Sequence, residues 1–393
     1  MNTYTWKHRT GFARFVAAAF LSISSNVYAQ QVGRAPVDVQ ILTTPTALFA
    51  LGRTQIVYEL HLTNFGSGTL GLRQIDALDS TNAVLGSWKE LALAQRVIAV
   101  GAQAVSQNSP SDRLELKPGA RSVAYMWIAL AQGMKKPVTI HHRLIFQSST
   151  KSDTVFTKST SLDQGSLVSL IPPVADGPWV ALRGPANSSG HRLSFVAVNG
   201  EAAIPQRYAV DWAKLGTDGK LFHGDSTINA NWYGYGTPVK SVASGTVVWA
   251  RADVLEHSAL TLVAPDVVEA ADALGNAIIV DIGSGRFATY AHLKPGSLLV
   301  KLGDRVSAGQ TIAALGNSGN SLAPHLHFHI SSSPKPLGGE GLPYVLPAFE
   351  LMGRVNSAAS LLSGMAWTLN PAQPARRVEG ETPLENMVVR FNP

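Results

Sequence analysis

The sequence predicts a mainly β protein, with an N-terminal immunoglobulin-like β-sandwich followed by a second unit of antiparallel strands. Two observations lead to this fold class. Val, Thr and Ile recur in short runs that Gly, Asn, Asp and Pro interrupt, and charged residues are sparse at 15%. A chain of 393 residues is long enough for two or three compact units, each with its own core.

The first 29 residues have the pattern of a secretory signal peptide. Basic side chains at Lys7, Arg9 and Arg14 precede an apolar run, and Val27-Tyr28-Ala29 forms a cleavage site with small residues. No other stretch approaches the roughly 20 apolar residues that a membrane span requires, so no membrane span is expected. The sequence therefore predicts an exported, soluble mature protein.

Charge and cysteine content narrow the class of partner. Removal of residues 1–29 takes away three basic side chains and leaves 29 basic against 26 acidic ones, so the formal charge falls from +6 to +3. The chain has no Lys/Arg run of the kind that binds nucleic acid, and no nucleic-acid partner is expected. Cysteine is absent, so disulfides are excluded and any zinc must be held by His, Asp or Glu.

Residues 30–165 are predicted to form the β-sandwich. Short strand-like runs such as "QIVYELHLTNF", "SVAYMWIAL" and "VTIHHRLIFQ" follow one another without a helical period. His61, His141 and His142 fall inside these runs. We interpret them as ordinary strand residues, because no histidine or carboxylate stands at ligand spacing from them.

A segment rich in Pro, Gly and Ser, residues 166–200, is predicted to be a linker. Strand-like runs resume over residues 201–345, the predicted second domain, with an insertion between Arg251 and Leu274 that is long enough to wall a groove. Residues 346–393 are predicted to be a C-terminal extension, in which "NMVVRF" would add an edge strand. The chain contains neither a P-loop nor a G-x-S-x-G motif, which gives no support to nucleotide hydrolysis or serine-hydrolase chemistry.

The stretch "PHLHFHI" places His325, His327 and His329 at alternate positions. On a strand these three side chains share one face, while the intervening Leu, Phe and Ile share the other and can pack on a core. A row of imidazoles covers apolar surface poorly, and a bound metal would explain it. His325 and His327 lie about 7 Å apart on such a strand and His329 about 13 Å from His325, so His329 is expected to be a groove-wall residue or an auxiliary ligand.

Taken in order, the segments "YAVD", "GTPVKSVASGTVV", "GNAIIVDIGSGRFATYAHL", "VKLGDRVSAGQTIAALGNSGNS" and "PHLHFHI" resemble the lysostaphin-type zinc metallopeptidases of peptidoglycan. The resemblance covers about 130 residues and implies that residues 201–345 form a lysostaphin-type β-barrel or antiparallel-sheet peptidase domain. By position, it implies that Asp211 and His327 bind one Zn²⁺ and that His325 and His292 are catalytic histidines. Three protein ligands leave a zinc position open for water and a carbonyl group.

The sequence departs from the family motif H-x-x-x-D at its first position. Arg207 stands four residues before Asp211, and a guanidinium has no lone pair for a metal. A subgroup that resembles this chain combines "QRYAxD" with an upstream "HR", which implies His191 as the missing ligand if "LSFVAVNGEAAIPQR" forms a hairpin. His223 and the absence of a complete site remain alternatives, and His257 is interpreted as a solvated loop residue.

The predicted function is that of an exported, periplasmic zinc metalloendopeptidase that hydrolyses peptide cross-links or stem peptides of peptidoglycan. The alternative is a degenerate relative that binds and activates a cell-wall amidase, an interpretation that Arg207 favours and the retained His292, His325 and His327 oppose. A biotinyl or lipoyl carrier domain is disfavoured, because the hairpin "GNSGN" has no acceptor lysine.

Overall fold

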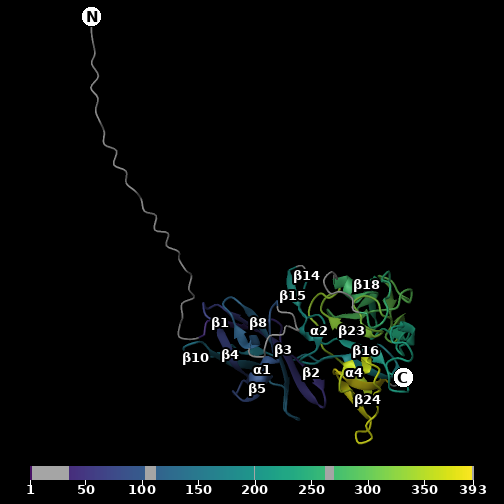
Figure 1. Ribbon diagram of the computed structural model, residues 1–393, viewed down its shortest axis with the longest axis horizontal. Helices are drawn as coiled ribbons and strands as arrows, with labels where there is room; N and C mark the ends of the chain where they lie inside the picture. The colour runs from purple at the N-terminus through teal and green to yellow at the C-terminus, as the bar shows by residue number, and fades with distance from the viewer. Residues whose placement is uncertain (2–34, 102–111, 199, 262–269, 392–393) are drawn as a thin grey trace.

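The computed structural model describes residues 1, 35–101, 112–198, 200–261 and 270–391. Over these residues the chain is mainly β and forms two lobes that lie side by side (Figure 1). Residues 2–29 of the predicted signal peptide lie outside the described residues. None of the described helices is both long and apolar enough to cross a bilayer.

The N-terminal lobe is a β-sandwich of two antiparallel sheets. Alternating apolar residues of both sheets, including Tyr58, Leu60, Leu144 and Phe146, close a core between them. The first sheet contains β1 (Val37–Gln40), β2 (Thr46–Ala50), β3 (Arg53–Asn64), β6 (Val97–Ala99) and β8 (Arg121–Ala129). The second contains β4 (Leu70–Asp79), β5 (Val84–Lys89), β7 (Glu115–Leu116), β9 (Thr139–Gln147), β10 (Ser152–Phe156) and β11 (Thr160–Ser161).

The C-terminal lobe is built on one large, mixed but mostly antiparallel sheet. Its main path runs β12-β24-β26-β13-β16-β23-β20-β19-β18-β21, and β25 pairs with β24. These strands are β12 (Val168–Ser169), β13 (Asp176–Arg183), β16 (Val210–Lys214), β18 (Gly245–Arg251), β19 (Ala277–Asp281), β20 (Phe287–Ala291), β21 (Arg305–Val306), β23 (Leu326–Ser331), β24 (Tyr344–Arg354), β25 (Arg376–Glu381) and β26 (Met387–Phe391).

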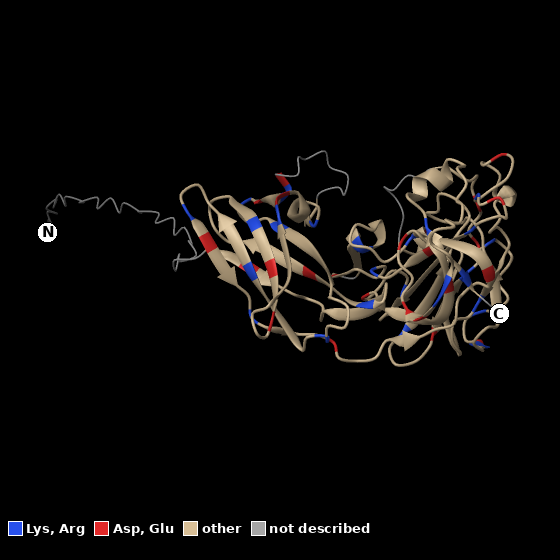
Figure 2. Cartoon of the chain, turned by 90° about the horizontal axis from the view of Figure 1, so that it is seen from below, with Lys and Arg blue, Asp and Glu red and all other residues tan. Residues whose placement is uncertain are grey.

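Small elements complete both lobes. Two short antiparallel pairs form, one a hairpin between β14 (Val196–Val198) and β15 (Glu201–Ala203), the other between the distant strands β17 (Pro238–Lys240) and β22 (Thr311–Ala314). The described helices are one or two turns long: α1 (Glu90–Ala94), η1 (Asp112–Leu114), α2 (Gly190–Leu193), η2 (Asn229–Asn231), α3 (Ala270–Leu274) and α4 (Ala358–Leu362). Basic and acidic residues are interspersed along both lobes (Figure 2).

Two segments contribute more to the large sheet than their sequences suggested. Residues 166–200, predicted as a linker, include β13, because the apolar run "WVAL" between Gly/Pro-rich turns is buried between β16 and β26. Residues 346–393, predicted as an extension, supply most of β24 together with β25 and β26. The strand β26 pairs on both sides, with β13 and β24, and is therefore an inner strand rather than an edge strand.

The two lobes share a continuous apolar core where they meet. Leu48, Ala50 and Val57 of the sandwich belong to the same buried cluster as Trp179 and Tyr208 of the second lobe. The Glu381 carboxylate also accepts hydrogen bonds from the backbone N–H groups of Leu51 and Gly52. This contact fixes the sandwich against the sheet that carries the predicted site.

Candidate active site

Three neighbouring strands bring the predicted site residues together. Strand β23 lies between β16 and β20, and its His327 stands directly opposite Asp211 on one side and Ala291 on the other. Opposed residues on neighbouring strands point to the same face of a sheet, with Cβ atoms about 5 Å apart. Leu326, Phe328 and Ile330 point the other way into the core, as the alternation in "PHLHFHI" predicted.

His191 reaches the same face from outside these strands. Strand β13 pairs with β16 and places Arg183 opposite Asp211, and the chain then turns into α2, which carries His191. The segment that returns to Asp211 contains the antiparallel pair β14 and β15, so the predicted hairpin forms. The structure therefore places His191 beside Asp211, although twenty residues separate them in sequence.

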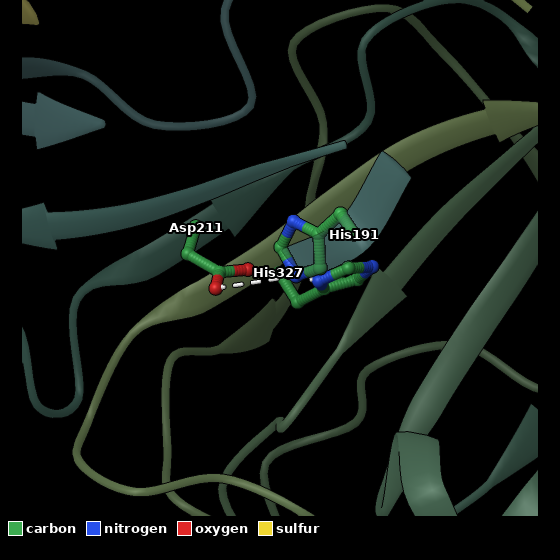
Figure 3. A group of neighbouring side chains, drawn as sticks. All are labelled: His191, Asp211 and His327. Carbon is green, nitrogen blue, oxygen red and sulfur yellow. Dashed lines mark hydrogen bonds and ion pairs between the residues drawn. The ribbon is translucent and has the colours of Figure 1, made fainter. Parts of the chain in front are cut away.

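His191, Asp211 and His327 form a compact group of potential metal ligands (Figure 3). One ligand atom from each lies within 4.8 Å of the others, and all three residues are buried. His327 Nδ1 lies 2.8 Å from Asp211 Oδ1, and His191 Nε2 lies 3.4 Å from Asp211 Oδ2. Both imidazoles thus turn a ring nitrogen towards the same carboxylate.

The protonation states of this group suit metal binding. Burial opposes ionisation of Asp211, but its neighbours hold the pKa of its carboxyl group well below the usual value. These neighbours are the imidazoles of His191 and His325, together with hydrogen bonds from His325 and His327. Burial lowers the pKa of His191 to about 3, against the attraction of Asp211. The group therefore pairs an ionised carboxylate with a neutral imidazole, the forms in which both side chains coordinate metals.

The donor set fits zinc. Two imidazole nitrogens and one carboxylate oxygen are ligands that Zn²⁺ prefers, and atoms bound tetrahedrally at its usual bond lengths lie about 3.3 Å apart. The separations of 2.8 and 3.4 Å from the carboxylate agree with this spacing. Among the described residues, the buried Nδ1 atom of His191 has no hydrogen-bond partner.

His292 adjoins the group directly after β20. Its backbone φ of 60° lies in the left-handed region, which non-glycine residues seldom adopt and which is concentrated at functional sites. Its N–H donates to the Leu274 carbonyl, and its Nδ1 lies 2.9 Å from the Ser318 carbonyl oxygen. Because a carbonyl only accepts, Nδ1 carries the hydrogen and Nε2 keeps its lone pair in the neutral ring.

Tight loop contacts make this orientation of His292 possible. A Cβ atom on Gly275 would lie 2.5 Å from the Ser318 backbone, so only glycine allows the two loops to approach this closely. Ser318 belongs to the segment "GNSGNS", and its carbonyl group orients the predicted catalytic histidine. Burial, together with repulsion from His325 and His327, lowers the pKa of His292 well below its usual value.

His325 faces His292 across the site. The ring centroids lie 4.8 Å apart, and His325 Nδ1 donates to the Ala323 carbonyl oxygen at 2.7 Å. Its Nε2 lies 3.5 Å from Asp211 Oδ1. Burial disfavours the charged imidazole, but the Asp211 carboxylate outweighs burial and raises the pKa of His325 above the usual value.

His329 lies behind His327, on the same face of β23. Its Nδ1 is 2.9 Å from His327 Nε2, and it is almost fully buried. It lies outside the group of three ligand atoms, and its contact is with the ring of a predicted ligand rather than with the carboxylate. His329 is therefore suited to fix the ring of His327, a role that the sequence, which suggested a groove wall or an auxiliary ligand, did not anticipate.

The residues set aside as alternatives lie elsewhere. Arg207 points away from the cluster and pairs with Glu59 and Glu340. His223 is exposed and packs against Tyr233, and His257 Nε2 contacts the Gly319 carbonyl oxygen. Within the described part of the chain, neither histidine belongs to the group around Asp211.

A cavity of about 390 Å³ opens over the site. The predicted ligands and catalytic histidines line its floor, and Ala273 and Leu274 of α3, at the end of the predicted insertion, form part of its wall. The exposed Arg183 and the side chain of Gln206 also line it. The site is thus accessible to a ligand larger than water.

An open set of metal ligands beside two further imidazoles is the arrangement of zinc hydrolases. Residues 231–338 match Peptidase family M23, and the chain accordingly carries an M23 peptidase domain of the lysostaphin type. The matched range includes His292, His325 and His327. It begins after Asp211, which agrees with the departure from the family motif at Arg207.

The chain is similar over short stretches to two peptidoglycan DD-endopeptidases of Vibrio cholerae serotype O1. It is 36% identical to ShyA over 63 residues, which cover 16% of this chain and 14% of ShyA. It is 35% identical to ShyC over 85 residues, which cover 21% of this chain and 17% of ShyC. The chain therefore matches less than a fifth of the length of either relative. The catalytic domain of the antimicrobial peptidase lysostaphin from Staphylococcus simulans aligns with 30% of this chain and 80% of that domain, at 29% identity and a TM-score of 0.19.

Proposed function

We propose that the protein is an exported zinc metalloendopeptidase that hydrolyses peptide cross-links or stem peptides of peptidoglycan. One observation supports this proposal above all others: His191, Asp211 and His327 form a full set of three potential ligands although Arg207 replaces the usual one. The match to Peptidase family M23 supports peptidase activity, and the relatives named peptidoglycan DD-endopeptidases suggest the substrate. The predicted signal peptide suggests a periplasmic location.

Zinc, when bound by His191, Asp211 and His327, supplies a Lewis acid that activates water and polarises an amide carbonyl group. The chain's own residues then have distinct tasks. Asp211 provides the negative charge that offsets the cation, and His329 keeps the ring of His327 in one orientation through the contact at 2.9 Å. The surrounding apolar sheet holds these side chains in place.

His292 and His325 are positioned to move protons. Each donates its Nδ1 hydrogen to a fixed backbone carbonyl, so each can present Nε2 to a reacting group in the cavity. Hydrolysis of an amide requires removal of a proton from water and delivery of one to the departing nitrogen. Two imidazoles with ring centroids 4.8 Å apart can perform both tasks, and a protonated one can stabilise a developing oxyanion.

The position of Arg207 supports hydrolysis over the alternative of a non-catalytic activator of wall amidases. An arginine in the ligand position would block or neutralise a metal site if its guanidinium remained there. Its pairing with Glu59 and Glu340 instead leaves the carboxylate of Asp211 to the histidines. An activator that only binds a partner would also have no need for five buried or half-buried site residues with matched orientations.

Digestion of cross-linked muropeptides by the zinc-loaded mature protein tests the proposal. We expect dimeric muropeptides to be converted to monomers, with one water added per bond, as measured by mass spectrometry. His325→Ala should retain zinc and lose at least about 100-fold in rate, the usual contribution of a general acid or base. Intact dimers after treatment with fully loaded protein, combined with stimulation of a wall amidase, would favour the activator instead.

A further inference from the structure

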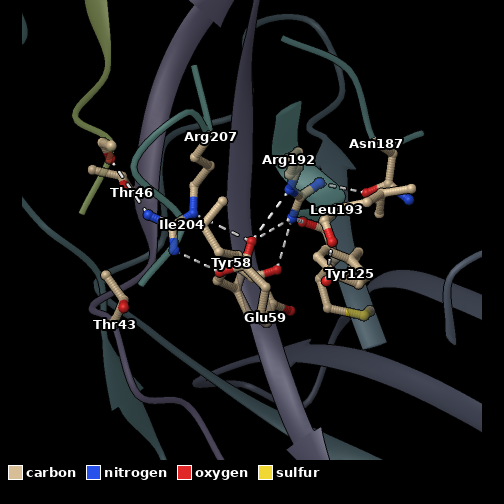
Figure 4. A network of polar contacts seen from close by, with 12 residues as sticks. Thr43, Thr46, Tyr58, Glu59, Tyr125, Asn187, Arg192, Leu193, Ile204 and Arg207 are labelled. Atoms are coloured by element: carbon tan, nitrogen blue, oxygen red, sulfur yellow. Dashed lines mark hydrogen bonds and ion pairs between the residues drawn. The ribbon is translucent and has the colours of Figure 1, made fainter. Parts of the chain in front are cut away.

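The segment that carries His191 is held by the N-terminal sandwich. Arg192, the next residue of α2, is fully buried and points into the sandwich rather than towards its own domain (Figure 4). Its Nε and Nη2 atoms donate to Glu59 Oε1 at 3.2 and 3.1 Å. Nη2 also donates to the backbone carbonyls of Tyr58 and Met126, each at 2.9 Å.

The environment of Arg192 fixes its side chain closely. The guanidinium lies 5.6 Å from the ring centroids of both Tyr125 and Trp127, at a distance that allows cation–π attraction. Its Nη1 donates to Asn187 in the turn that leads to α2. Strands β3 and β8 of the sandwich therefore bind the residue adjacent to a predicted metal ligand through several hydrogen bonds.

Glu59 also holds the other end of the same segment. Arg207 Nη2 donates to Glu59 Oε2 at 3.0 Å (Figure 4). Its Nη1 pairs with Glu340 at 2.7 Å. Arg207 precedes Asp211 by four residues. The carboxylate of Glu59, which is 4% exposed, thus binds both Arg192, next to His191, and Arg207, four residues before Asp211.

Apolar contacts reinforce this attachment. Ile204 is buried against Val123 and Tyr125 of the sandwich, and Leu193 packs on the same cluster. The Phe195 ring lies 5.6 Å from the His61 ring of β3. The segment between His191 and Asp211 therefore contacts the sandwich near both of its ends, through residues 192–195 and 204–207.

We infer that Glu59 is a positioning residue for the zinc site, and that the N-terminal sandwich is required for full zinc affinity. This inference rests on the proposed zinc site and assigns the sandwich its part in that site. The Cα atoms of His191 and Arg192 lie about 3.8 Å apart, as in any trans peptide, so a shift of one displaces the other. A metal site tolerates displacements of only about 0.5 Å in its ligands.

The sandwich acts through support and not by covering the site. Among the described residues, the cavity lining begins at Leu182 and includes none from the N-terminal lobe. Glu59 therefore touches no reacting group, and its influence reaches the metal through Arg192 and His191. This arrangement predicts an effect on zinc affinity rather than on access of a substrate.

Zinc affinity of the full mature chain, measured by competition with a chromophoric chelator, tests the inference. Glu59→Gln removes the charge that holds both arginines, and we expect a dissociation constant about 10-fold higher, as for other residues that orient a metal ligand. Glu381→Gln is the matched control, because Glu381 also joins the two lobes while its partners, the N–H groups of Leu51 and Gly52, do not lead to a ligand. Its zinc affinity should equal that of the unaltered chain.

Hydrogen–deuterium exchange of the metal-free protein provides a second readout. We expect faster exchange over residues 190–207 in Glu59→Gln but not in Glu381→Gln. Equal zinc affinity and equal exchange in the two variants would overturn the inference. If Glu59→Gln does not fold, Arg192→Lys takes its place, because a lysine cannot make the contacts with Tyr58, Glu59 and Met126 at once.

The outcome also separates this inference from the proposed function. An unaltered chain that binds no zinc would contradict the proposed function, while the exchange measurement would still decide whether Glu59 orders the segment. An unaltered chain that binds zinc, with no loss of affinity in Glu59→Gln or Arg192→Lys, would contradict the inference alone.

Discussion

Two buried carboxylates in this protein have opposite surroundings. Asp211 of β16 faces the imidazoles of His191, His325 and His327. Glu59 of β3 is enclosed by the guanidinium groups of Arg192 and Arg207. In both cases burial opposes ionisation, and neighbouring side chains outweigh it and lower the pKa of the carboxyl group.

The difference between the partners determines what each carboxylate can do. A guanidinium has donors only and stays charged, so the acceptors of Glu59 are permanently paired and the cluster is structural. An imidazole can turn a lone pair towards the centre, so the group around Asp211 can exchange its internal contacts for a cation. Four residues separate Arg207 from Asp211, and yet the two belong to different clusters.

The largest effect is expected from the cluster around Asp211. Asp211→Asn keeps the size of the side chain and removes its charge, so zinc content should fall from one per chain to near zero. Inductively coupled plasma mass spectrometry of the purified variant measures this. The surface variant Asp253→Asn, whose carboxylate is exposed, is the control and should keep its zinc. Full zinc occupancy in Asp211→Asn would show that the ion binds elsewhere.

The second effect concerns stability rather than metal. Glu59→Ala leaves two buried guanidinium groups without their shared carboxylate, and loss of one partner from a buried ion pair costs about 3 to 5 kcal/mol. Urea unfolding of the metal-free protein should register this loss. Arg377→Ala breaks an exposed pair with Glu379 and should cost less than about 0.5 kcal/mol. Similar losses in the two variants would contradict the assignment of Glu59 as the centre of the structural cluster.

A third buried group, the imidazole of His142 in β9, contacts the hydroxyl groups of Tyr58 and Thr157 instead of a charged partner. The Tyr58 hydroxyl lies 2.7 Å from its Nε2, and burial lowers the pKa of the imidazole to about 3, from an ordinary value of 6.5. Between these two values the unfolded chain binds the additional proton. Stability is therefore lost as the pH falls from 6.5 towards 3.

His142 alone should lower the free energy of unfolding by about 2 kcal/mol between pH 7.5 and pH 5. Urea unfolding at the two pH values measures the difference. In His142→Gln that difference should shrink by the same amount. An unchanged pH dependence in the variant would show that this histidine does not remain neutral in the folded protein.

The smallest effect is expected from His329. His329→Ala removes the ring that contacts His327 Nε2 but leaves the three predicted ligands, so zinc should bind about 10-fold more weakly, with unchanged stoichiometry. Chelator competition measures this change. A loss of all zinc would instead identify His329 as a ligand, the other role that its place on the strand allowed.

The sequence was sufficient for the local features of the site. Alternation in "PHLHFHI" predicted which side chains of β23 face the core, and the resemblance carried by "YAVD" and "YAHL" indicated Asp211 and His292. The mainly β fold was also predicted correctly, and the hairpin that the choice of His191 required is present. These features depend on periods of two residues and on turns, which short segments encode by themselves.

The rest depended on contacts between distant segments. Nothing near Glu59 points to Arg192, 133 residues later, and the "HR" pair that contains Arg192 does not reveal that its partner is Glu59. The strand "WVAL" was hidden among Pro and Gly residues, because its burial is decided by β16 and β26 on either side. The orientation of Arg207 followed only from the position of the sandwich. Such pairings are set by the packing of whole sheets, and the sequence pattern does not contain them.

Zinc analysis of His191→Ala beside His223→Ala tests the central claim most directly. Both variants remove one imidazole from the same lobe, but only His191 faces Asp211. We expect one zinc per chain in the unaltered protein and in His223→Ala, and almost none in His191→Ala. Undiminished zinc in His191→Ala, or none in the unaltered protein after incubation with the ion, would contradict the claim.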